Sequence, residues 1–122
     1  MRRLYGVMLA GVLLGSLPFG EQTVKAENVV ADPQNGRTVF DMNCATCHGA
    51  SGKGDGPTGA YMSPPPADLT SEDVRTDPEP ELLSIISNGM PGKGMPAWKS
   101  SLSTQEMHDV LAYIRTLSDP GK

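Results

Sequence analysis

The sequence predicts an all-α domain of three to four helices joined by long loops. Residues 103–117 carry apolar side chains at the spacing of a single helix face. Two stretches rich in glycine and proline, 49–66 and 89–98, predict loops. No stretch shows a convincing alternation of apolar and polar residues, which is the pattern of a half-buried strand.

Residues 1–26 are predicted to be an export signal that is removed. Arg2 and Arg3 precede an apolar run over residues 4–19, and a small-x-small cleavage pattern ends at Ala26. The run is shorter than the roughly 20 residues of a usual membrane span, so cleavage is favoured over the alternative of a retained anchor. We therefore expect a periplasmic or otherwise exported protein.

Charge and composition exclude one class of partner. The chain has 10 basic and 14 acidic side chains, a formal net charge of −4, and removal of the signal would make it more acidic. Nucleic-acid binding needs a basic surface, so no nucleic-acid partner is expected.

With 14 glycines, 11 prolines and few aromatic residues, the chain is loop-rich and has little material for a conventional core.

Residues 27–34 form a polar lead-in, and a helix is expected from residue 35 or 36 to about residue 44. Val39 and Phe40 give this helix a short apolar side. Gly36 in its first turn lowers helix stability. A second helix that crosses closely at this point would explain the glycine.

A short turn is expected to begin at Ser71, and a better helix covers residues 77–88. Asp77 can cap this helix, Pro78 sits in its first turn, and Gly89 follows as the terminating residue. Its buried side is predicted to consist of Leu82, Leu83, Ile85 and Ile86.

The last helix is the clearest. Ser103 caps it, Glu106 completes a capping box, and the helix is expected to end near Thr116. Its apolar stripe consists of Met107, Val110, Leu111, Ile114 and Leu117. The domain is therefore expected to span residues 35–118, with residues 119–122 as a C-terminal tail.

The stretch from Cys44 to His48 carries the chemistry. Two cysteines three positions apart, followed directly by a histidine, form the attachment signature of a c-type haem. Each thiol, Cys44 and Cys47, would become a thioether to a haem vinyl group, and His48 would bind the iron. A thioredoxin-like pair would need a preceding strand. A structural zinc site would need four ligands; only Cys44, Cys47, His48 and His108 are available, and the adjacency of Cys47 and His48 makes a closed tetrahedron awkward. One covalent haem c is therefore the expected cofactor.

A haem held by His48 has one axial position left on its iron. The candidates are Met42, Met62, Met90, Met95, Met107 and His108. The first is too close to the attachment site, and Met107 belongs to the apolar stripe. His108 lies beside that stripe and is expected on the surface.

The three remaining methionines lie in loops, where a flexible thioether can approach the iron from the other face. Met95 is favoured over Met90 and Met62 because Gly94 allows a close approach and Pro96 fixes the exit of the chain. Met90 is followed by proline in the same way, so it stays the main competitor.

The motif Cys44-x-x-Cys47-His48-Gly49 is followed by a glycine-rich loop, Pro66-Ala67-Asp68-Leu69-Thr70, Gly94-Met95-Pro96-Ala97 and an amphipathic terminal helix. This order resembles the class I cytochromes c, most of all the small bacterial mono-haem type that also occurs as a domain of terminal oxidases and periplasmic dehydrogenases. The resemblance covers roughly residues 35–118. The doubled Met-Pro pattern departs from the family and leaves the methionine ligand open.

The resemblance implies positions for several residues. Gly36 and Phe40 would pack against the terminal helix near Tyr113, and a loop carbonyl near Pro57 would accept the Nδ1 proton of His48. Phe40, Pro57 and Trp98 would pack in the haem pocket.

An iron with protein ligands on both faces has no vacant position for a substrate, so we expect a one-electron carrier rather than an enzyme. The alternative is a haem subunit of a larger oxidoreductase, and a peroxidase or gas-binding protein is less favoured. The partners would be redox proteins, the free protein a monomer, and any membrane contact would come through a partner or a retained anchor. Lys53, Lys93 and Lys99 are hypothesised to form a basic docking rim at the haem edge, although they fit ordinary solvated surface equally well.

Overall fold

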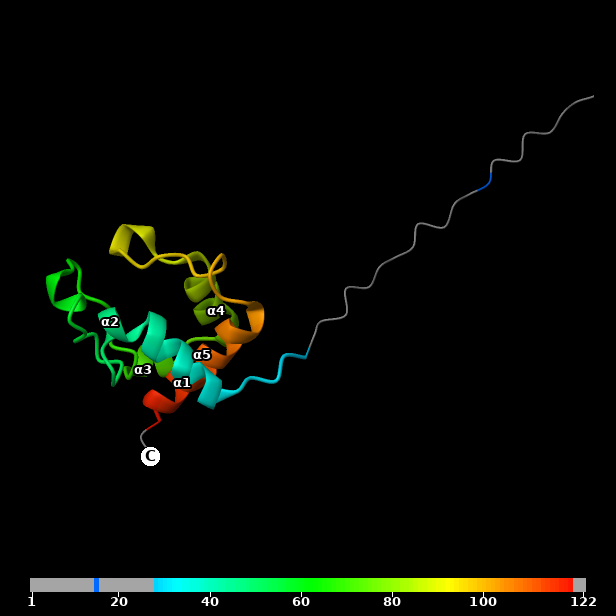
Figure 1. The fold of residues 1–122 in the computed structure, drawn as a ribbon, viewed down its shortest axis with the longest axis horizontal. Helices are drawn as coiled ribbons and strands as arrows, with labels where there is room; N and C mark the ends of the chain where they lie inside the picture. Colours follow the sequence, from blue (N-terminus) through cyan, green and yellow to red (C-terminus); the bar gives the residue numbers. More distant parts are fainter. Residues whose placement is uncertain (1–14, 16–27, 120–122) are drawn as a thin grey trace, which may run out of the picture.

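A computed structural model describes residues 28–119 together with Gly15, so the rest of the predicted export signal lies outside the described residues. Its α-helices are α1 (Pro33–Asn43), α2 (Ala45–His48), α3 (Glu72–Thr76), α4 (Glu79–Asn88) and α5 (Thr104–Leu117), and its 3₁₀ turns are η1 (Gly59–Tyr61) and η2 (Pro91–Lys93). This confirms the all-α prediction (Figure 1). The described part has three longer helices, α1, α4 and α5, and two short ones, α2 and α3. Three to four helices were expected in all. None of the described helices is long and apolar enough to cross a bilayer.

Helix α1 begins earlier than predicted. The Asp32 carboxylate accepts hydrogen bonds from the main-chain N–H groups of Gln34 (2.8 Å) and Asn35 (3.3 Å), and Pro33 occupies the first helical position. Asp32 and Pro33 are ordinary start signals of a helix, although the polar lead-in was expected to include them. The helix ends at Asn43, and Cys44 is its C-cap.

Helices α1 and α5 cross at the closest contact of the fold. A Cβ atom added to Gly36 would lie 1.9 Å from the main-chain oxygen of Asp109, so only glycine permits this approach. One turn later, the rings of Phe40 and Tyr113 meet edge to face with centroids 5.3 Å apart. The predicted packing of Gly36 and Phe40 against the last helix is confirmed.

The lead-in is fastened to the same crossing. Its Asp32 N–H donates to the Asp109 carboxylate (2.8 Å), and the Gln105 side chain donates to the Val30 carbonyl (2.9 Å). Asn35 and Gln105 also donate to Asp109 (2.7 Å each). Asp109 is 2% exposed, so these hydrogen bonds satisfy a buried carboxylate.

The helix starts near residues 71–79 were partly predicted. The Ser71 hydroxyl accepts from Val74 N–H and starts α3, as expected. The prediction that Asp77 caps α4 is wrong, because Asp77 is the C-cap of α3 and Pro78 is the N-cap of α4. The extended conformation of Asp77 separates the two helices, as is usual for a residue before proline.

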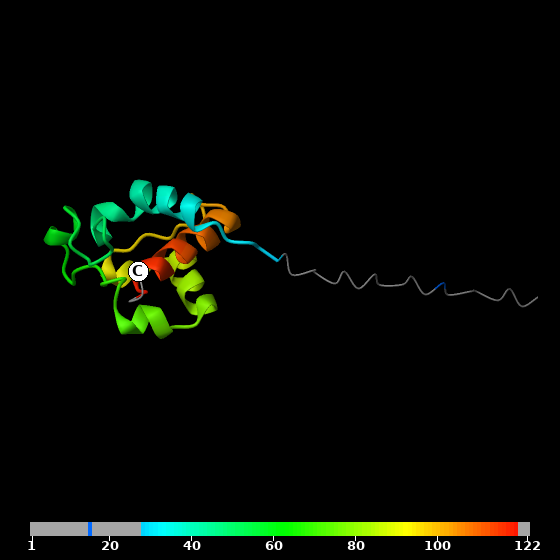
Figure 2. The same ribbon diagram turned by 90° about the horizontal axis from the view of Figure 1, so that it is seen from below.

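Helix α5 follows its sequence pattern closely. Ser103 Oγ accepts from Glu106 N–H (3.2 Å), and the Glu106 carboxylate accepts from Ser103 N–H (2.8 Å), so the predicted capping box is confirmed. The helix ends at Leu117, one residue beyond the predicted end. Figure 2 shows α1 and the α3–α4 pair on opposite sides of the molecule, with α5 between them. The buried core consists of Val39, Phe40, Leu82, Ile86, Leu102, Val110, Leu111 and Ile114.

Candidate functional site

A cavity of about 650 Å³ lies between α5, the attachment motif and the two long loops. This volume is in the range of sites that enclose small molecules and cofactors. The residues on its wall that could hold a haem or its iron are Cys44, Cys47, His48, Met62, Met90 and Met95. The structure therefore brings the predicted attachment residues and all three loop methionines to one cavity.

The apolar wall of the cavity comes mainly from the helices. Aliphatic side chains of α4 and α5 face it, together with Leu69, Val74 and Trp98; the helix residues are Leu82, Ile85, Ile86, Val110, Leu111 and Ile114. A large apolar cavity next to two free cysteines is what a covalently attached porphyrin requires. The residues present therefore fit haem c, which would complete the core of a domain with few aromatic side chains.

The attachment motif occupies a single helical turn. Cys44 follows α1, and the His48 N–H donates to its carbonyl oxygen across α2 (2.9 Å). This turn places Cys44, Cys47 and His48 on the same cavity. Burial raises the pKa of the Cys44 thiol to about 11, and the neighbouring Cys47 acts in the same direction, so this thiol is protonated at neutral pH in the chain without haem.

The ring of His48 is held by a main-chain carbonyl. Its Nδ1 lies 3.0 Å from the oxygen of Ala67, and a carbonyl can only accept, so Nδ1 carries the proton and Nε2 is free to bind a metal. The expectation that a carbonyl near Pro57 accepts this proton is wrong. The sequence offers no signal for Ala67, because any residue has a carbonyl group and the contact depends on how the loop folds.

The first part of the glycine-rich loop packs on the attachment turn. The N–H groups of Gly54, Gly56 and Thr58 donate to the carbonyls of His48, Cys47 and Thr46 at 2.7–3.1 Å. A Cβ atom on Gly56 would lie 2.4 Å from the Thr46 oxygen. Backbone atoms thus satisfy the last carbonyls of α2, and only the later part of the loop, from Met62 onward, reaches the cavity.

Met90 and Met95 face each other across a tight turn. The N–H of each donates to the carbonyl of the other, at 3.0 and 3.3 Å, and Gly94 takes the left-handed conformation with φ 77°. Directly opposite residues of such a pair point to the same side. Both side chains line the cavity, so the position of the loop alone does not select one of them.

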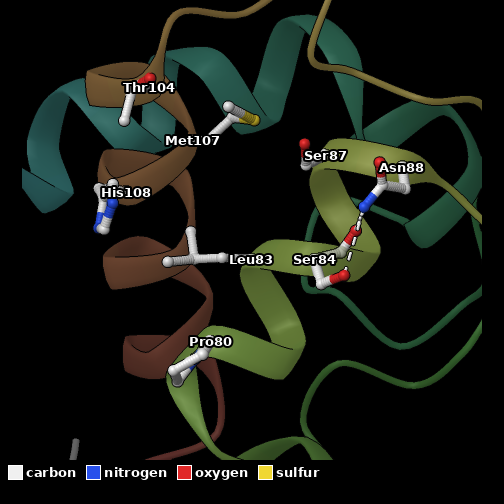
Figure 3. Close-up of a pocket in the computed structure, with 8 residues that line it drawn as sticks. All are labelled: Pro80, Leu83, Ser84, Ser87, Asn88, Thr104, Met107 and His108. Carbon is white, nitrogen blue, oxygen red and sulfur yellow. Dashed lines mark hydrogen bonds between the residues drawn. The ribbon is translucent and has the colours of Figure 1, made fainter.

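The other candidate ligands lie elsewhere. Met42 is 76% exposed. Met107 and His108 line a separate shallow groove of about 280 Å³ between α4 and α5 (Figure 3). There His108 Nδ1 lies 3.4 Å from a carboxylate oxygen of Glu79, and the His108 side chain is 23% exposed, so it is half-buried where a surface position was expected.

The predicted pocket residues divide into two groups. Trp98 lines the cavity. Phe40 and Pro57 are not among the described residues of the cavity wall: Phe40 is fully buried in the α1–α5 crossing, and Pro57 is exposed. Phe40 therefore supports the cavity only indirectly, through α5.

The charged residues near the cavity carry both signs. Of the three lysines predicted to form a rim, Lys93 lines the cavity, Lys53 is exposed, and exposed Lys99 donates to the Asn88 side chain (3.2 Å). The cavity wall also carries three carboxylates that were not predicted, Asp68, Asp73 and Asp77. Hydrogen bonds from the hydroxyl and N–H of Thr70 hold the pKa of Asp68 below its usual value, and the charge of Lys53 adds to this.

Comparisons with known proteins agree with this site. The family model "Cytochrome c" matches residues 33–118. Cytochrome c6 of Nostoc sp. is 29% identical over 98% of this chain and 96% of its own length, and cytochrome c-554(547) of Halothiobacillus neapolitanus is 33% identical over 70% and 97%. The cbb3-type oxidase subunit CcoP of Azospirillum brasilense is 31% identical over 76% of this chain, which spans only about a third (31%) of that relative.

A solved structure has the same fold. It is a chain of the reducing HAO-like protein complex of Kuenenia stuttgartiensis, with a TM-score of 0.61 and 25% identity over 69% of this chain and 41% of that chain. Together with the cavity and its two cysteines, the family match shows that the cofactor is haem c. This chain belongs to the cytochrome c family, as a small mono-haem class I member.

Proposed function

We propose that this chain carries single electrons between redox proteins through a covalent haem bound in the 650 Å³ cavity. The observation that carries the proposal is the convergence of two free cysteines, a histidine with a free Nε2 and loop methionines on one apolar cavity. Haem supplies an iron that gains or loses one electron. The residues of the chain attach it, orient it and limit its contact with water.

Cys44 and Cys47 would form the thioethers, and His48 would bind the iron through Nε2. The hydrogen bond from Nδ1 to the Ala67 oxygen fixes the ring and increases its basicity. Apolar side chains of α4 and α5 surround the site. Burial of this kind favours the reduced state, which carries one positive charge less on the iron.

Met95 is the proposed second axial ligand. The chain that follows it is fixed to α4, because the N–H groups of Trp98 and Lys99 donate to the Ile86 and Ser87 carbonyls (3.1 Å each). The Met95 sulfur therefore belongs to a segment whose backbone is held in place by α4. A thioether ligand favours ferrous iron and raises the reduction potential.

Absorption spectra of single variants test the ligand. In the oxidised wild-type protein we expect a weak near-infrared band from sulfur bound to iron, and Met95→Ala should abolish it and lower the reduction potential. Met90→Ala, which changes the residue paired with Met95 across the same turn, should leave the band in place. Loss of the band in Met90→Ala alone would assign the ligand to Met90.

A second candidate is a haem subunit of a larger oxidoreductase. The oxidase-subunit relatives and the structural neighbour within a protein complex favour it. Purification from the native membrane and exported fractions would separate the two functions, because a subunit should elute with a large partner and a carrier as a free monomer. A peroxidase or gas-binding role predicts that carbon monoxide shifts the reduced spectrum, and we expect no shift.

Export and docking complete the proposal. Residues 1–26 would direct the chain out of the cytoplasm, and mass spectrometry of the exported protein should then find Glu27 as its first residue.

Lys93, Lys53 and Lys99 would steer an acidic partner toward the cavity mouth. Replacing Lys93 and Lys99 by Glu should slow electron transfer and flatten its dependence on ionic strength; unchanged rates and slope would discard the basic rim.

A further inference from the structure

One wall of the cavity is a short segment with little packing of its own. Helix α3 and the residues that link it to α4 contribute Asp73, Val74 and Asp77 to the cavity. No residue of α3 is buried, and Val74 is its one described contact with the hydrophobic core. A five-residue helix is not stable alone, so its position over the cavity needs another source of stability.

Arg115 of α5 supplies hydrogen bonds to this segment. Its guanidinium donates to the main-chain carbonyls of Val74, Arg75 (3.0 Å) and Asp77 (2.5 Å). The carbonyls at the C-terminal end of a helix have no partner within the helix. A planar guanidinium with five N–H donors can bind several of them at once, whereas an ammonium group offers one compact point of contact.

The donor comes from the most firmly held helix. Arg115 lies in the last turn of α5, after the turns of that helix that pack on α1 and line the cavity. It is far from α3 in sequence, by 38 to 41 residues for the three carbonyls. One side chain thus connects the stable crossing to the weakly packed wall.

We propose that Arg115 is a positioning residue that holds α3 and the α3–α4 link closed over the haem, limits the access of water, and thereby raises the reduction potential. The inference rests on the proposed location of haem in this cavity. The physical reason is that ferric haem carries one positive charge more than ferrous haem, so water near the iron stabilises the oxidised state.

The test compares Arg115→Lys with the matched control Arg75→Lys, both as holoproteins. Arg115→Lys keeps the charge and removes the fork of donors. Arg75 lies on α3 itself, but its side chain pairs with exposed Glu72, so Arg75→Lys changes the same residue type without touching the wall contact.

Three readouts are expected to change in Arg115→Lys and to stay at wild-type values in Arg75→Lys. The amides of residues 75 and 77, which bond to the Ser71 and Asp73 carbonyls, should exchange hydrogen about tenfold faster or more, since hydrogen bonds to a charged donor are lost. Imidazole should bind the ferric iron faster. The midpoint potential should fall while the near-infrared sulfur band is kept.

Each outcome decides the inference. Unchanged exchange, imidazole binding and potential in Arg115→Lys would overturn it, as would equal changes in both variants. Failure of Arg115→Lys to fold, with Arg75→Lys folded, would make Arg115 a general structural residue and would also overturn the positioning role. Absence of covalent haem in the wild-type protein would instead refute the proposed function, which keeps the two failures distinct.

Discussion

The α1–α5 crossing and the cavity side of the domain are built on different principles. At the crossing, Gly36 and Phe40 of α1 and Val110 of α5 are buried between the two helices. The Asp109 carboxylate there accepts hydrogen bonds from three donors. On the cavity side, α4, α5, the short helix α3 and the loops surround an apolar space of about 650 Å³. The five glycines with positive φ in the described part, at positions 49, 52, 54, 89 and 94, all lie outside α1 and α5.

The difference indicates which part of the fold the chain can form alone. Side chains fill the crossing, so its stability comes from the protein itself. On the cavity side, turns of the main chain and apolar side chains form walls around a space that the haem would fill. Its order is therefore expected to depend on the haem, much as small domains depend on metals or disulfides.

Preventing haem attachment should have the largest effect and should separate the two regions. In the double variant Cys44→Ala with Cys47→Ala, we expect no covalent haem and a melting temperature at least about 10 °C lower. Hydrogen exchange should become fast across residues 62–71 and 89–98, whereas α1 and α5 should keep measurable protection. Uniform loss of protection in both regions would contradict the distinction.

Opening the crossing should come next. In Gly36→Ala the new methyl group meets a main-chain oxygen at 1.9 Å, so α1 and α5 must move apart, at a cost of about 3 kcal/mol. Chemical unfolding of the holoprotein would measure it. Gly92→Ala is the matched control, because nothing lies within 4 Å of its added Cβ, and it should leave the free energy of unfolding nearly unchanged.

Asp109 should give a smaller, pH-dependent effect. Burial opposes its ionisation, but hydrogen bonds from Asp32, Asn35 and Gln105 outweigh burial, so its pKa lies below the usual value. A carboxyl with a lowered folded-state pKa adds stability above its unfolded pKa of about 4, and this stability is lost as pH falls through the folded-state pKa.

We therefore expect Asp109→Asn to cost about 2 kcal/mol at neutral pH and to flatten the fall of stability in acid. Unfolding of the holoprotein followed from pH 7 to pH 2 would measure both. Asp41→Asn is a suitable control, because Asp41 forms only an exposed pair with Arg37 at 3.8 Å. A wild-type acid profile in Asp109→Asn would rule out this carboxylate as a source of stability.

Local signals predicted the fold well where neighbours in sequence decide the structure. The Ser103–Glu106 capping box and the apolar stripe behind it located α5 to within one residue. Ser71 marked the start of α3. The prediction that Asp77 caps α4 was wrong because Asp77 and Pro78 both lie just before that helix. A local pattern cannot show which of the two ends α3 and which begins α4.

The features that were missed depend on contacts between distant residues. The Ala67 carbonyl that binds His48 and the three carbonyls that bind Arg115 belong to main chain, which leaves no trace in side-chain identity. The attachment motif was recognisable because its chemistry needs particular side chains at a fixed spacing. Its orienting partners are set by the path of the loops, which the sequence pattern left open.

The attachment of the lead-in to α5 has a practical consequence for immobilisation. Because Val30 and Asp32 are bound to Gln105 and Asp109, anything joined ahead of residue 28 leaves the molecule near the first turn of α1, whereas the methionine turn and the η1 loop lie on another side (Figure 1). An electrode linker or affinity tag placed there should leave the mouth of the cavity open to solution. Such a fusion would tether every copy at the same point for measuring electron exchange.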